Sequence, residues 1–331
     1  MGQMEPINPQ QVREHIQKSL NTIPSSSYRP DLSIEVAFYG GSFTELPVAT
    51  QIAYLREALA AEKDKRFGGI RISTRPDSLS PSLLKVLKEH KVIMVELGAQ
   101  SMDDEVLRRI NRGHTAQHTI KAVKLLRSFA FKFGLQLMIG LPGEKEKSLN
   151  LTAERVIVLS PDVVRLHPTL VIKDTPLAKL YYSGLYKPLG LQEAIDKSKR
   201  LVIQFEQEGI KVIRIGLQSS AALESPGTIV AGPYHPAFGH MVKSAIFFDL
   251  LAVALKKLKI DAHQRIILKS SPSNISYLLG LKKENISSLQ SIYGFRQIKV
   301  EGDKNLLQDK VMVKIGKNSA IALIKELSYR L

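Results

Sequence analysis

The sequence predicts an α/β fold in which repeated strand–helix units surround a parallel sheet and a smaller α+β unit follows. Short apolar runs alternate with helical patterns from residue 33 to about 216, as is typical of βα units. The alternation ends in Ser219–Gly227, whose composition favours a loop. We therefore expect a sheet domain over residues 1–218, a linker over 219–238 and a basic α+β domain over 239–331.

The predicted strands of the large domain are bounded by helices with recognisable starts. Asn8 and Pro9 open a helix that precedes the first strand, Pro47 opens another, and Ser80 with Pro81 supplies an N-cap and first-turn pair. The expected strands are Ile34–Tyr39, Gly69–Ser73, Val92–Leu97, Leu135–Ile139, Val163–His167 and Val212–Ile215. The C-terminal part predicts a helix from about Gly239 to Lys257, a strand at Arg265–Lys269, two short helices around Gly280, and strands near Gln297–Val300 and Lys310–Ile315.

Composition limits the class of protein. The 331 residues, 44% of them hydrophobic, suffice for one large core and one small one. A spanning helix needs about 20 apolar residues, and the best run, Ala245–Leu255, contains Asp249. The N-terminus shows no export signal. We expect a cytoplasmic protein without a membrane partner.

The net charge bears on the binding partners of the protein, and the cysteine content bears on its chemistry. The formal net charge is +16, and Gly232–Leu331 holds 16 Lys and Arg against 7 Asp and Glu. This excess suits a polyanion such as nucleic acid, and it suits a generally basic, soluble surface equally well. The sequence has no cysteine, which excludes disulfides, thiolate metal sites and a cysteine nucleophile.

Distinctive peptides follow the first two strands, where the βα loops of a parallel sheet form ligand sites. Gly40 and Gly41 follow the first strand, so the backbone there can approach a ligand closely, although paired glycines also make simple turns. The second strand ends in Ser73-Thr74-Arg75-Pro76-Asp77, in which Arg75 and Asp77 are a site or a structural salt bridge.

Later strands carry polar residues at alternate positions. Glu96, Gly98 and Gln100 share one face of the third strand, and burying such a carboxylate and amide is costly without a partner or ligand. Arg165 and His167 alternate on the fifth strand, and His167 reads more readily as a core histidine than as a catalytic one.

Taken in order, these peptides resemble the radical S-adenosylmethionine domain of the Elongator catalytic subunit and its bacterial relatives that lack an acetyltransferase domain. The resemblance covers roughly Ile34–Gln218, with Ala231–Gly239 matching a further segment. Its motifs are Glu35–Thr44, Ser73–Asp77, Val95–Ser101, Arg112–Thr115, Gln136–Gly143 and Arg165–Val171. It implies a partial (β/α)6 TIM-like barrel that lacks its first strand.

The resemblance also implies a cofactor site. Gly40 and Gly41, with Ser42 adjacent, would contact the amino and carboxylate groups of S-adenosylmethionine. The methionine and ribose portions would lie near Ser73, Arg75 and Gln100, and the adenine would lie between residues around Met138, Gly140 and Leu141.

One feature of the family is missing. In members of that family, the first barrel strand leads into a CxxxCxxC loop. The thiolates of this loop hold a four-iron four-sulfur cluster, which is the electron source for cleavage of the cofactor. This chain has no cysteine, and its opening, Met1–Pro9, resembles the segment just downstream of that loop. We expect no radical chemistry from the chain as written, and an unpaired edge on the strand Ile34–Tyr39. A late start, a truncated product and a gene remnant all fit.

The basic C-terminal part contains a second motif. Leu279–Leu289 follows the spacing of the KH module, in which a GxxG loop joins two helices and grips nucleic-acid backbone. Gly280 fits the pattern, and Lys283, after Lys282, replaces its second glycine. An ordinary helix–loop–helix with exposed basic residues fits equally well.

Three functions follow from these observations. The first is a cluster-deficient Elongator-like protein whose complete version modifies RNA, in particular transfer RNA. The second is a non-catalytic RNA-binding protein that keeps the barrel as a scaffold. The third is a barrel enzyme that uses Glu96, Arg165 and His167 for acid–base chemistry. The sequence does not decide whether the chain is an enzyme, nor its oligomeric state.

Overall fold

The computed structural model describes residues 8–24, 33–260 and 264–328. The chain forms two compact units, one comprising residues 1–137 and 147–165 and the other residues 138–146 and 166–331. The segment Met1–Ile7, which carries most of the expected link to the cysteine loop, lies outside the described residues.

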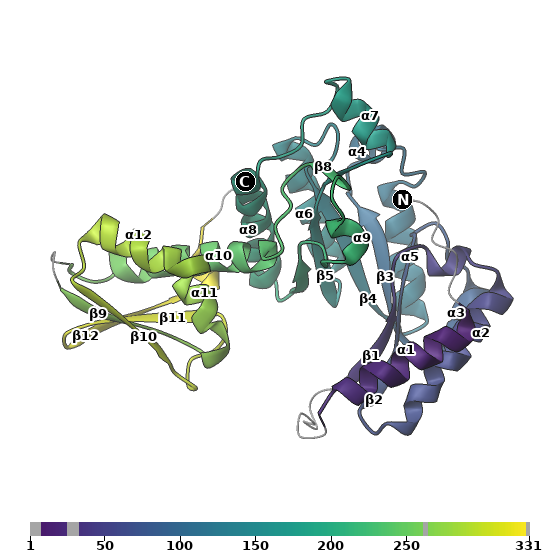
Figure 1. Cartoon of the computed structure of the whole chain (residues 1–331), viewed down its shortest axis with the longest axis horizontal. Coiled ribbons are helices and arrows are strands. Elements are labelled where there is room, and N and C mark those ends of the chain that lie inside the picture. Colours follow the sequence, from purple (N-terminus) through teal and green to yellow (C-terminus); the bar gives the residue numbers. More distant parts are fainter. Residues whose placement is uncertain (1–7, 25–32, 261–263, 329–331) are drawn as a thin grey trace. The chain divides into compact units, whose positions relative to one another are not determined.

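A curled half-barrel of parallel strands is the main feature of the fold (Figure 1). Its six strands run in the order β1-β2-β3-β4-β5-β7, and β1–β2, β2–β3 and β3–β4 pair in parallel. All six strands predicted from the sequence are confirmed. Their bounds are Ile34–Phe38 (β1), Phe67–Thr74 (β2), Val92–Gln100 (β3), Lys132–Ile139 (β4), Val163–Pro168 (β5) and Lys211–Ile215 (β7).

Helices connect successive strands, as βα units require. Asn8 caps the first helix by accepting a hydrogen bond from the Gln10 amide at 3.0 Å, and Ser80 caps α3 by accepting from the Leu83 amide at 3.3 Å. The main helices are Pro9–Thr22 (α1), Val48–Leu59 (α2), Pro81–Glu89 (α3), Ala116–Ser128 (α5), Glu146–Leu159 (α6) and Leu191–Gln207 (α8). Short helices lie at Asp104–Arg109 (α4) and Pro176–Tyr182 (α7).

Strand β1 lies at one end of the half-barrel sheet. Among the described residues it pairs only with β2, so its other edge has no strand partner there. This is the unpaired edge that the sequence led us to expect.

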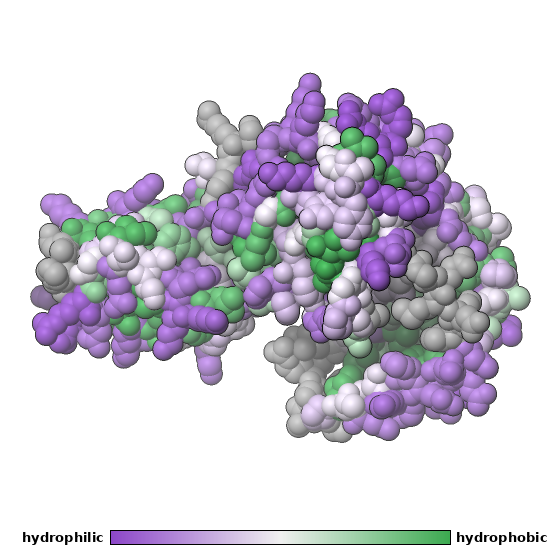
Figure 2. Space-filling model, turned by 45° about the horizontal axis from the view of Figure 1, so that its top comes forward, coloured by the Kyte–Doolittle hydropathy of each residue, from purple (hydrophilic) through white to green (hydrophobic). Residues whose placement is uncertain are grey.

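The core lies on both sides of the central strands. Strand β3 is almost wholly buried, with Val95, Leu97 and Ala99 fully so, which matches the continuous apolar character expected of a parallel strand covered on two faces. Hydrophilic residues predominate on the visible surface, with hydrophobic residues in small scattered groups (Figure 2).

The C-terminal part is an α+β unit, as predicted. Helix α10 (Phe238–Lys256) is followed by a four-stranded sheet in the order β10-β9-β11-β12. Strands β9 (Arg265–Ser270) and β10 (Gln297–Gly302) pair in parallel, and α11 (Ile275–Leu279) and α12 (Glu284–Tyr293) connect them. Strand β11 (Lys310–Ile315) runs antiparallel to β9 and to β12 (Asn318–Leu323), a strand that the sequence analysis missed.

The expected loop Ser219–Gly227 contains one helical turn, α9 (Ala221–Glu224). Ser220 explains it, because its Oγ accepts a hydrogen bond from the Leu223 amide at 3.2 Å. The segment that follows forms β8 (Ile229–Ala231), which pairs antiparallel with β6 (Val171–Ile172).

Helix α10 is long and apolar enough to cross a membrane by length and composition alone. Half of its most apolar window is buried in the fold, and it packs against α8, α11, β11 and β12. A core helix of a soluble protein passes the same test, so this single helix is weak evidence for a membrane span.

Candidate functional site

The backbone is exposed where β1 ends. Gly40 has a φ of +107°, which favours glycine, and a Cβ at Gly40 or Gly41 would meet no atom within 4 Å. The amides and carbonyls of this turn are therefore accessible to a ligand, as the sequence predicts.

Ser42 connects this turn to the end of β2. Its Oγ lies 3.0 Å from Oγ1 of Thr74, and the Arg75 amide donates to the same Oγ at 3.3 Å. The guanidinium of Arg75 pairs with Asp77 at 2.6 Å and with Glu45 at 3.2 Å, and the hydrogen bond to Asp77 raises the pKa of Arg75. The structural salt bridge, one of the two alternatives for this peptide, is thus present. Ser73 is half-buried, on the same face of β2 as Arg71.

A polar group is buried where β3 ends. Gln100 has a φ of +64°, and a Cβ at Gly98 would lie 3.0 Å from both Nε2 of Gln100 and Nη2 of Arg112. Arg112 donates to the Gly98 carbonyl at 3.2 Å, and Nε2 of His114 lies 3.3 Å from the Ala99 carbonyl. Glycine at position 98 thus leaves room for the Gln100 amide and the Arg112 guanidinium at the end of the strand.

Each of these three side chains keeps a buried polar atom without a hydrogen-bond partner: Oε1 of Gln100, Nε of Arg112 and Nδ1 of His114. Gln100 is 7% exposed and His114 is 4% exposed. Because buried polar atoms are usually paired, the group has hydrogen-bonding capacity that the fold itself does not use.

Electrostatics in this group follow from burial. Burial lowers the pKa of Arg112, and the neighbouring charge of Arg75 lowers it further. Burial also lowers the pKa of His114, and the positive charge of Arg112 adds to this effect. His114 is therefore held neutral beside a guanidinium, and an anionic group nearby would relieve the repulsion between the two arginines.

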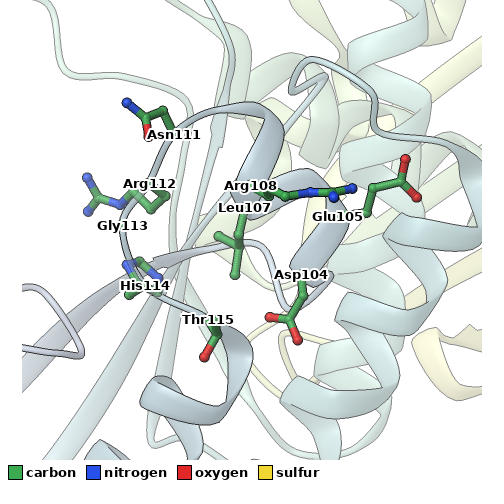
Figure 3. Close-up of a pocket in the computed structure, with 9 residues that line it drawn as sticks. All are labelled: Asp104, Glu105, Leu107, Arg108, Asn111, Arg112, Gly113, His114 and Thr115. Atoms are coloured by element: carbon green, nitrogen blue, oxygen red, sulfur yellow. The ribbon is translucent and has the colours of Figure 1, made fainter.

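A cavity of about 570 Å³ adjoins this group between α4 and the start of α5. Figure 3 shows Asn111, Arg112 and His114 along the loop on one side, with Glu105 and Arg108 pointing away on the other. Arg112–Thr115 is one of the motifs in the sequence, but the sequence alone indicates no role for Arg112 or His114. The available signal was Gly113, whose φ of +79° turns the loop and brings it against Arg75.

A second polar network lies on the face of the half-barrel strands that carries Glu96. The Glu96 side chain is 2% exposed; its Oε1 accepts from Tyr39 at 2.6 Å and from Arg71 at 2.9 Å, and its Oε2 lies 2.6 Å from Nε of Arg165. Arg71 also pairs with Glu35 at 2.5 Å. Burial and the hydrogen bond to Glu96 raise the pKa of Tyr39. Both oxygens of Glu96 are thus engaged by the protein, which argues against a role as a catalytic base.

Met138, Gly140 and Leu141 belong to the other compact unit and are described there by themselves. Both backbone groups of Gly140 are engaged within the protein: its amide donates to Glu144 at 2.7 Å, and its carbonyl accepts from Tyr186 at 2.6 Å. A contact of Gly140 with an adenine ring would therefore be a van der Waals contact and not a hydrogen bond through these two groups. His167 is half-buried in the same unit.

The KH-like loop joins two helices, as its spacing predicts. Gly280 ends α11 with a φ of +78°, and Lys282 and Lys283 follow with φ values of 51° and 64° before α12 begins. Both lysine side chains are exposed. Asn285 fixes the loop from within, because its Nδ2 donates to carbonyls of Ser244 and Tyr277 at 3.0 and 3.1 Å.

The residues present fit one of the two expected cofactors. An open glycine turn and three buried polar atoms without partners suit the amino, carboxylate and ribose groups of S-adenosylmethionine. The iron–sulfur cluster does not fit this chain, because the sequence contains no thiolate. Within residues 8–24, 33–260 and 264–328 no three His, Asp or Glu side chains group closely enough to hold a metal ion.

Comparison with known proteins identifies the family to which the fold belongs. Residues 27–156 match the radical SAM superfamily, and residues 161–247 match the radical SAM C-terminal domain. The tRNA uridine(34) acetyltransferase of Methanocaldococcus infernus is 30% identical over 187 residues, 50% of this chain and 35% of that protein. The heme chaperone HemW of Bacillus subtilis is 27% identical over 243 residues, 70% of this chain and 62% of that protein.

The fold is also similar to that of a solved structure. The archaeal Methanocaldococcus infernus Elp3 with an N-terminal deletion (1-46) superposes with a TM-score of 0.61 at 25% identity, covering 72% of this chain and 58% of that one. The chain thus spans less than two thirds of each of these proteins. From its half-barrel and these matches, the chain belongs to the radical SAM superfamily, and within it the chain is similar both to Elongator-type proteins and to HemW.

Proposed function

We propose that this chain serves transfer-RNA modification as an Elongator-like protein, holding S-adenosylmethionine at the strand ends of its half-barrel and RNA at its C-terminal unit. The proposal is carried by the buried group of Gln100, Arg112 and His114 together with the open Gly40–Gly41 turn. Arg75 connects the two, because its amide donates to Ser42 and its guanidinium lies against Gly113. The name of the Methanocaldococcus infernus relative, a tRNA uridine(34) acetyltransferase, supports RNA as the substrate.

Each residue of the site has a distinct task in this proposal. The amides and carbonyls of Gly40 and Gly41 bind the amino and carboxylate groups of the cofactor, and Ser42 fixes the turn through Thr74 and the Arg75 amide. Arg112 supplies a cation for the carboxylate, and Gln100 accepts from a hydroxyl or ammonium group. S-adenosylmethionine, when bound, would supply a sulfonium centre that is open to reduction by an electron donor from outside this chain.

The chain does not provide the cluster that would reduce this sulfonium, because it has no cysteine. We therefore assign it binding of cofactor and RNA, and no radical step of its own. A non-catalytic RNA-binding protein with a barrel scaffold is the second candidate, and the same lack of cysteine favours it. The two candidates differ in one measurable property, which is cofactor binding.

Equilibrium dialysis with radiolabelled S-adenosylmethionine distinguishes them. The wild-type chain is expected to bind the cofactor, and Arg112→Gln is expected to weaken binding by about tenfold or more, since a charge-assisted hydrogen bond contributes roughly 1.5–3 kcal/mol. Arg112→Lys, which keeps the charge, should recover part of the loss.

Arg109→Gln is the matched control, because Arg109 forms an exposed pair with Glu105 on the neighbouring helix α4. Its affinity should equal that of the wild type. Wild-type protein that is folded by circular dichroism but binds no S-adenosylmethionine would exclude the cofactor role and leave the scaffold candidate.

The RNA contact is tested at the KH-like loop. Replacing Lys282 and Lys283 together with glutamine is expected to weaken binding of a transfer-RNA transcript and to lower the salt dependence of its affinity by about two counterions. Lys121→Gln with Lys124→Gln, two exposed changes on α5, supply the control. Equal affinity of the loop variant and the control would contradict the KH-like interpretation.

A further inference from the structure

The C-terminal sheet has one covered face and one open face. The buried residues Ile266, Leu268, Val311 and Val313 point to the side on which α10 and α11 pack. Because side chains alternate along a strand, the intervening residues point the other way, and they are exposed or half-buried. This sheet follows residue 247, so it lies outside both matched family regions.

The open face is strongly basic. Its cations are Arg265 and Lys269 on β9, Lys299 on β10, and Lys310 and Lys314 on β11. The one carboxylate at an outward position of these strands is Glu301, which pairs with Lys299 at 2.8 Å and with Lys269 at 3.2 Å. Five cations against one anion leave a net charge of +4 on this face.

The register fixes the spacing of these charges. Lys299 and Lys314 both pair with Ile267, so they lie on opposite sides of β9, roughly 10 Å apart at the usual strand separation. Arg265 and Lys269 are separated by four residues along β9, roughly 13 Å. The cations therefore spread over a surface wide enough to meet several phosphates, rather than forming one point site.

The remaining outward side chains limit what such a surface can bind. They include Ile267, Met312 and Ile321, the last of them 38% exposed, and no outward position on the four described strands is aromatic. Surfaces that bind single strands stack bases on aromatic rings, and this one has no ring to offer. Duplex RNA is contacted mainly through its backbone and shape, which needs cations without rings.

We propose that this open sheet face, defined by Arg265, Lys269, Lys299, Lys310 and Lys314, binds the phosphate backbone of a duplex stem in a structured RNA. The proposal rests on the RNA-directed function proposed above and adds to it a contact surface separate from the Lys282–Lys283 loop. It accounts for charge that the KH-like loop leaves unexplained. Recognition by this face is independent of base sequence and depends steeply on salt.

The test compares binding of an RNA hairpin stem and of a single-stranded RNA of equal length. The triple variant Arg265→Gln, Lys299→Gln, Lys314→Gln changes three exposed side chains and keeps the core. It should bind the hairpin about tenfold or more weakly, and the slope of log affinity against log salt should fall by about two to three. Single-strand binding should change much less.

A variant that removes a negative charge from the same face should have the opposite effect on binding. Glu301→Gln removes the one carboxylate and releases Lys269 and Lys299, so hairpin affinity should rise. Two controls match these charge changes: Lys121→Gln, Lys124→Gln, Lys147→Gln for the triple variant and Glu154→Gln for the single one, all on exposed helix positions. Neither control should alter hairpin binding.

Five outcomes overturn the inference. The triple variant could match its control, or Glu301→Gln could leave hairpin affinity unchanged. The Lys282–Lys283 variant alone could abolish hairpin binding, which would keep the proposed function and reject this surface. Phosphatidylglycerol vesicles could bind in place of RNA and be lost in the triple variant, which would assign the face to a membrane. A wild-type chain that binds neither transfer RNA nor hairpin would reject the proposed function as well.

Discussion

At the scale of the residue, Glu96 is the most consequential side chain of the half-barrel. It is 2% exposed and accompanies two guanidiniums that are themselves mostly buried, with 12% and 15% of the Arg71 and Arg165 side chains exposed. Replacing Glu96 leaves Arg165 without this carboxylate and Arg71 with Glu35 alone, and breaking a buried ion pair costs about 3–5 kcal/mol. We expect Glu96→Gln to lower the free energy of unfolding by this amount, measured by urea denaturation.

A surface pair supplies the comparison. Glu105 pairs with Arg109 at 2.9 Å on α4, but both side chains are more than half exposed. Glu105→Gln should therefore cost about 0.5 kcal/mol or less, because solvent screens such pairs. Equal costs for the two variants would show that the Glu96 network contributes no special stability.

The buried carboxyl of Glu144 makes the free energy of unfolding depend on pH. Burial raises the pKa of its carboxyl to about 7, against the opposing effect of the hydrogen bond from the Gly140 amide. The folded chain then binds more protons than the unfolded chain between the ordinary glutamate pKa and about 7, so stability falls as pH rises through this window. The loss should be about 1–3 kcal/mol.

Urea denaturation at pH 5 and at pH 8 measures this loss. Glu144→Gln keeps an oxygen that accepts from Gly140 and cannot ionise, so it should remove most of the difference and be the more stable protein at pH 8. Glu154→Gln, an exposed change on α6, should leave the difference unchanged. A wild-type chain that is equally stable at both pH values would show that Glu144 ionises normally.

The sequence predicted the residues of the candidate site unevenly. Gly40, Gly41, Ser42 and Gln100 could be chosen because they end strands, and their position relative to a strand is a local property. Arg112 and His114 could not, because they reach β3 only through the fold of the loop after α4. Whether Arg75 and Glu96 bind a ligand or a neighbour depends on long-range pairing that spacing does not show.

At the scale of the element, the turn between α11 and α12 depends on Gly280. Its φ of +78° and ψ of 167° are almost restricted to glycine, and a Cβ would lie 2.9 Å from the Asn285 amide nitrogen. Gly280→Ala should lower the free energy of unfolding by about 2–3 kcal/mol, since strain and a contact with backbone add. Thermal unfolding followed by circular dichroism measures the change.

A substitution at Gly316 measures the cost of backbone strain without a steric contact. It has a φ of +57° in the turn between β11 and β12, and a Cβ there would meet nothing within 4 Å. Gly316→Ala should cost about 1 kcal/mol from backbone strain alone. If both substitutions cost the same, the contact with Asn285 does not restrict the loop.

Elements were predicted well where a periodic pattern was long enough. The strands of the half-barrel and of β9, β10 and β11 agree with expectation to within a few residues. The additions are β12 and the β6–β8 pair. Strands β6 and β8 are only two and three residues long and pair with each other across a long stretch of sequence, whereas β12 has six residues and pairs with the preceding strand β11. Asn318–Leu323 carries an alternating pattern that marks a strand only once β11 lies beside it.

At the scale of the whole molecule, composition governs what the chain can do more than any single contact. The net charge of +16 favours association with polyanions in general, so specific RNA contacts have to be measured against this electrostatic background. Salt slopes and charge-matched controls are the measurements that separate the two, because general attraction does not depend on which lysine is removed.

Cysteine content gives the last prediction. Thiolates hold the irons of a four-iron cluster, and none occurs among the 331 residues of this chain. After anaerobic incubation with ferrous iron and sulfide, followed by desalting, the protein should retain no stoichiometric iron and show no visible absorption of a cluster. A family member that carries the CxxxCxxC motif, treated in parallel, should turn brown. Stoichiometric iron with a cluster spectrum in this chain would require ligands other than cysteine, and would contradict the proposal that it performs no radical step by itself.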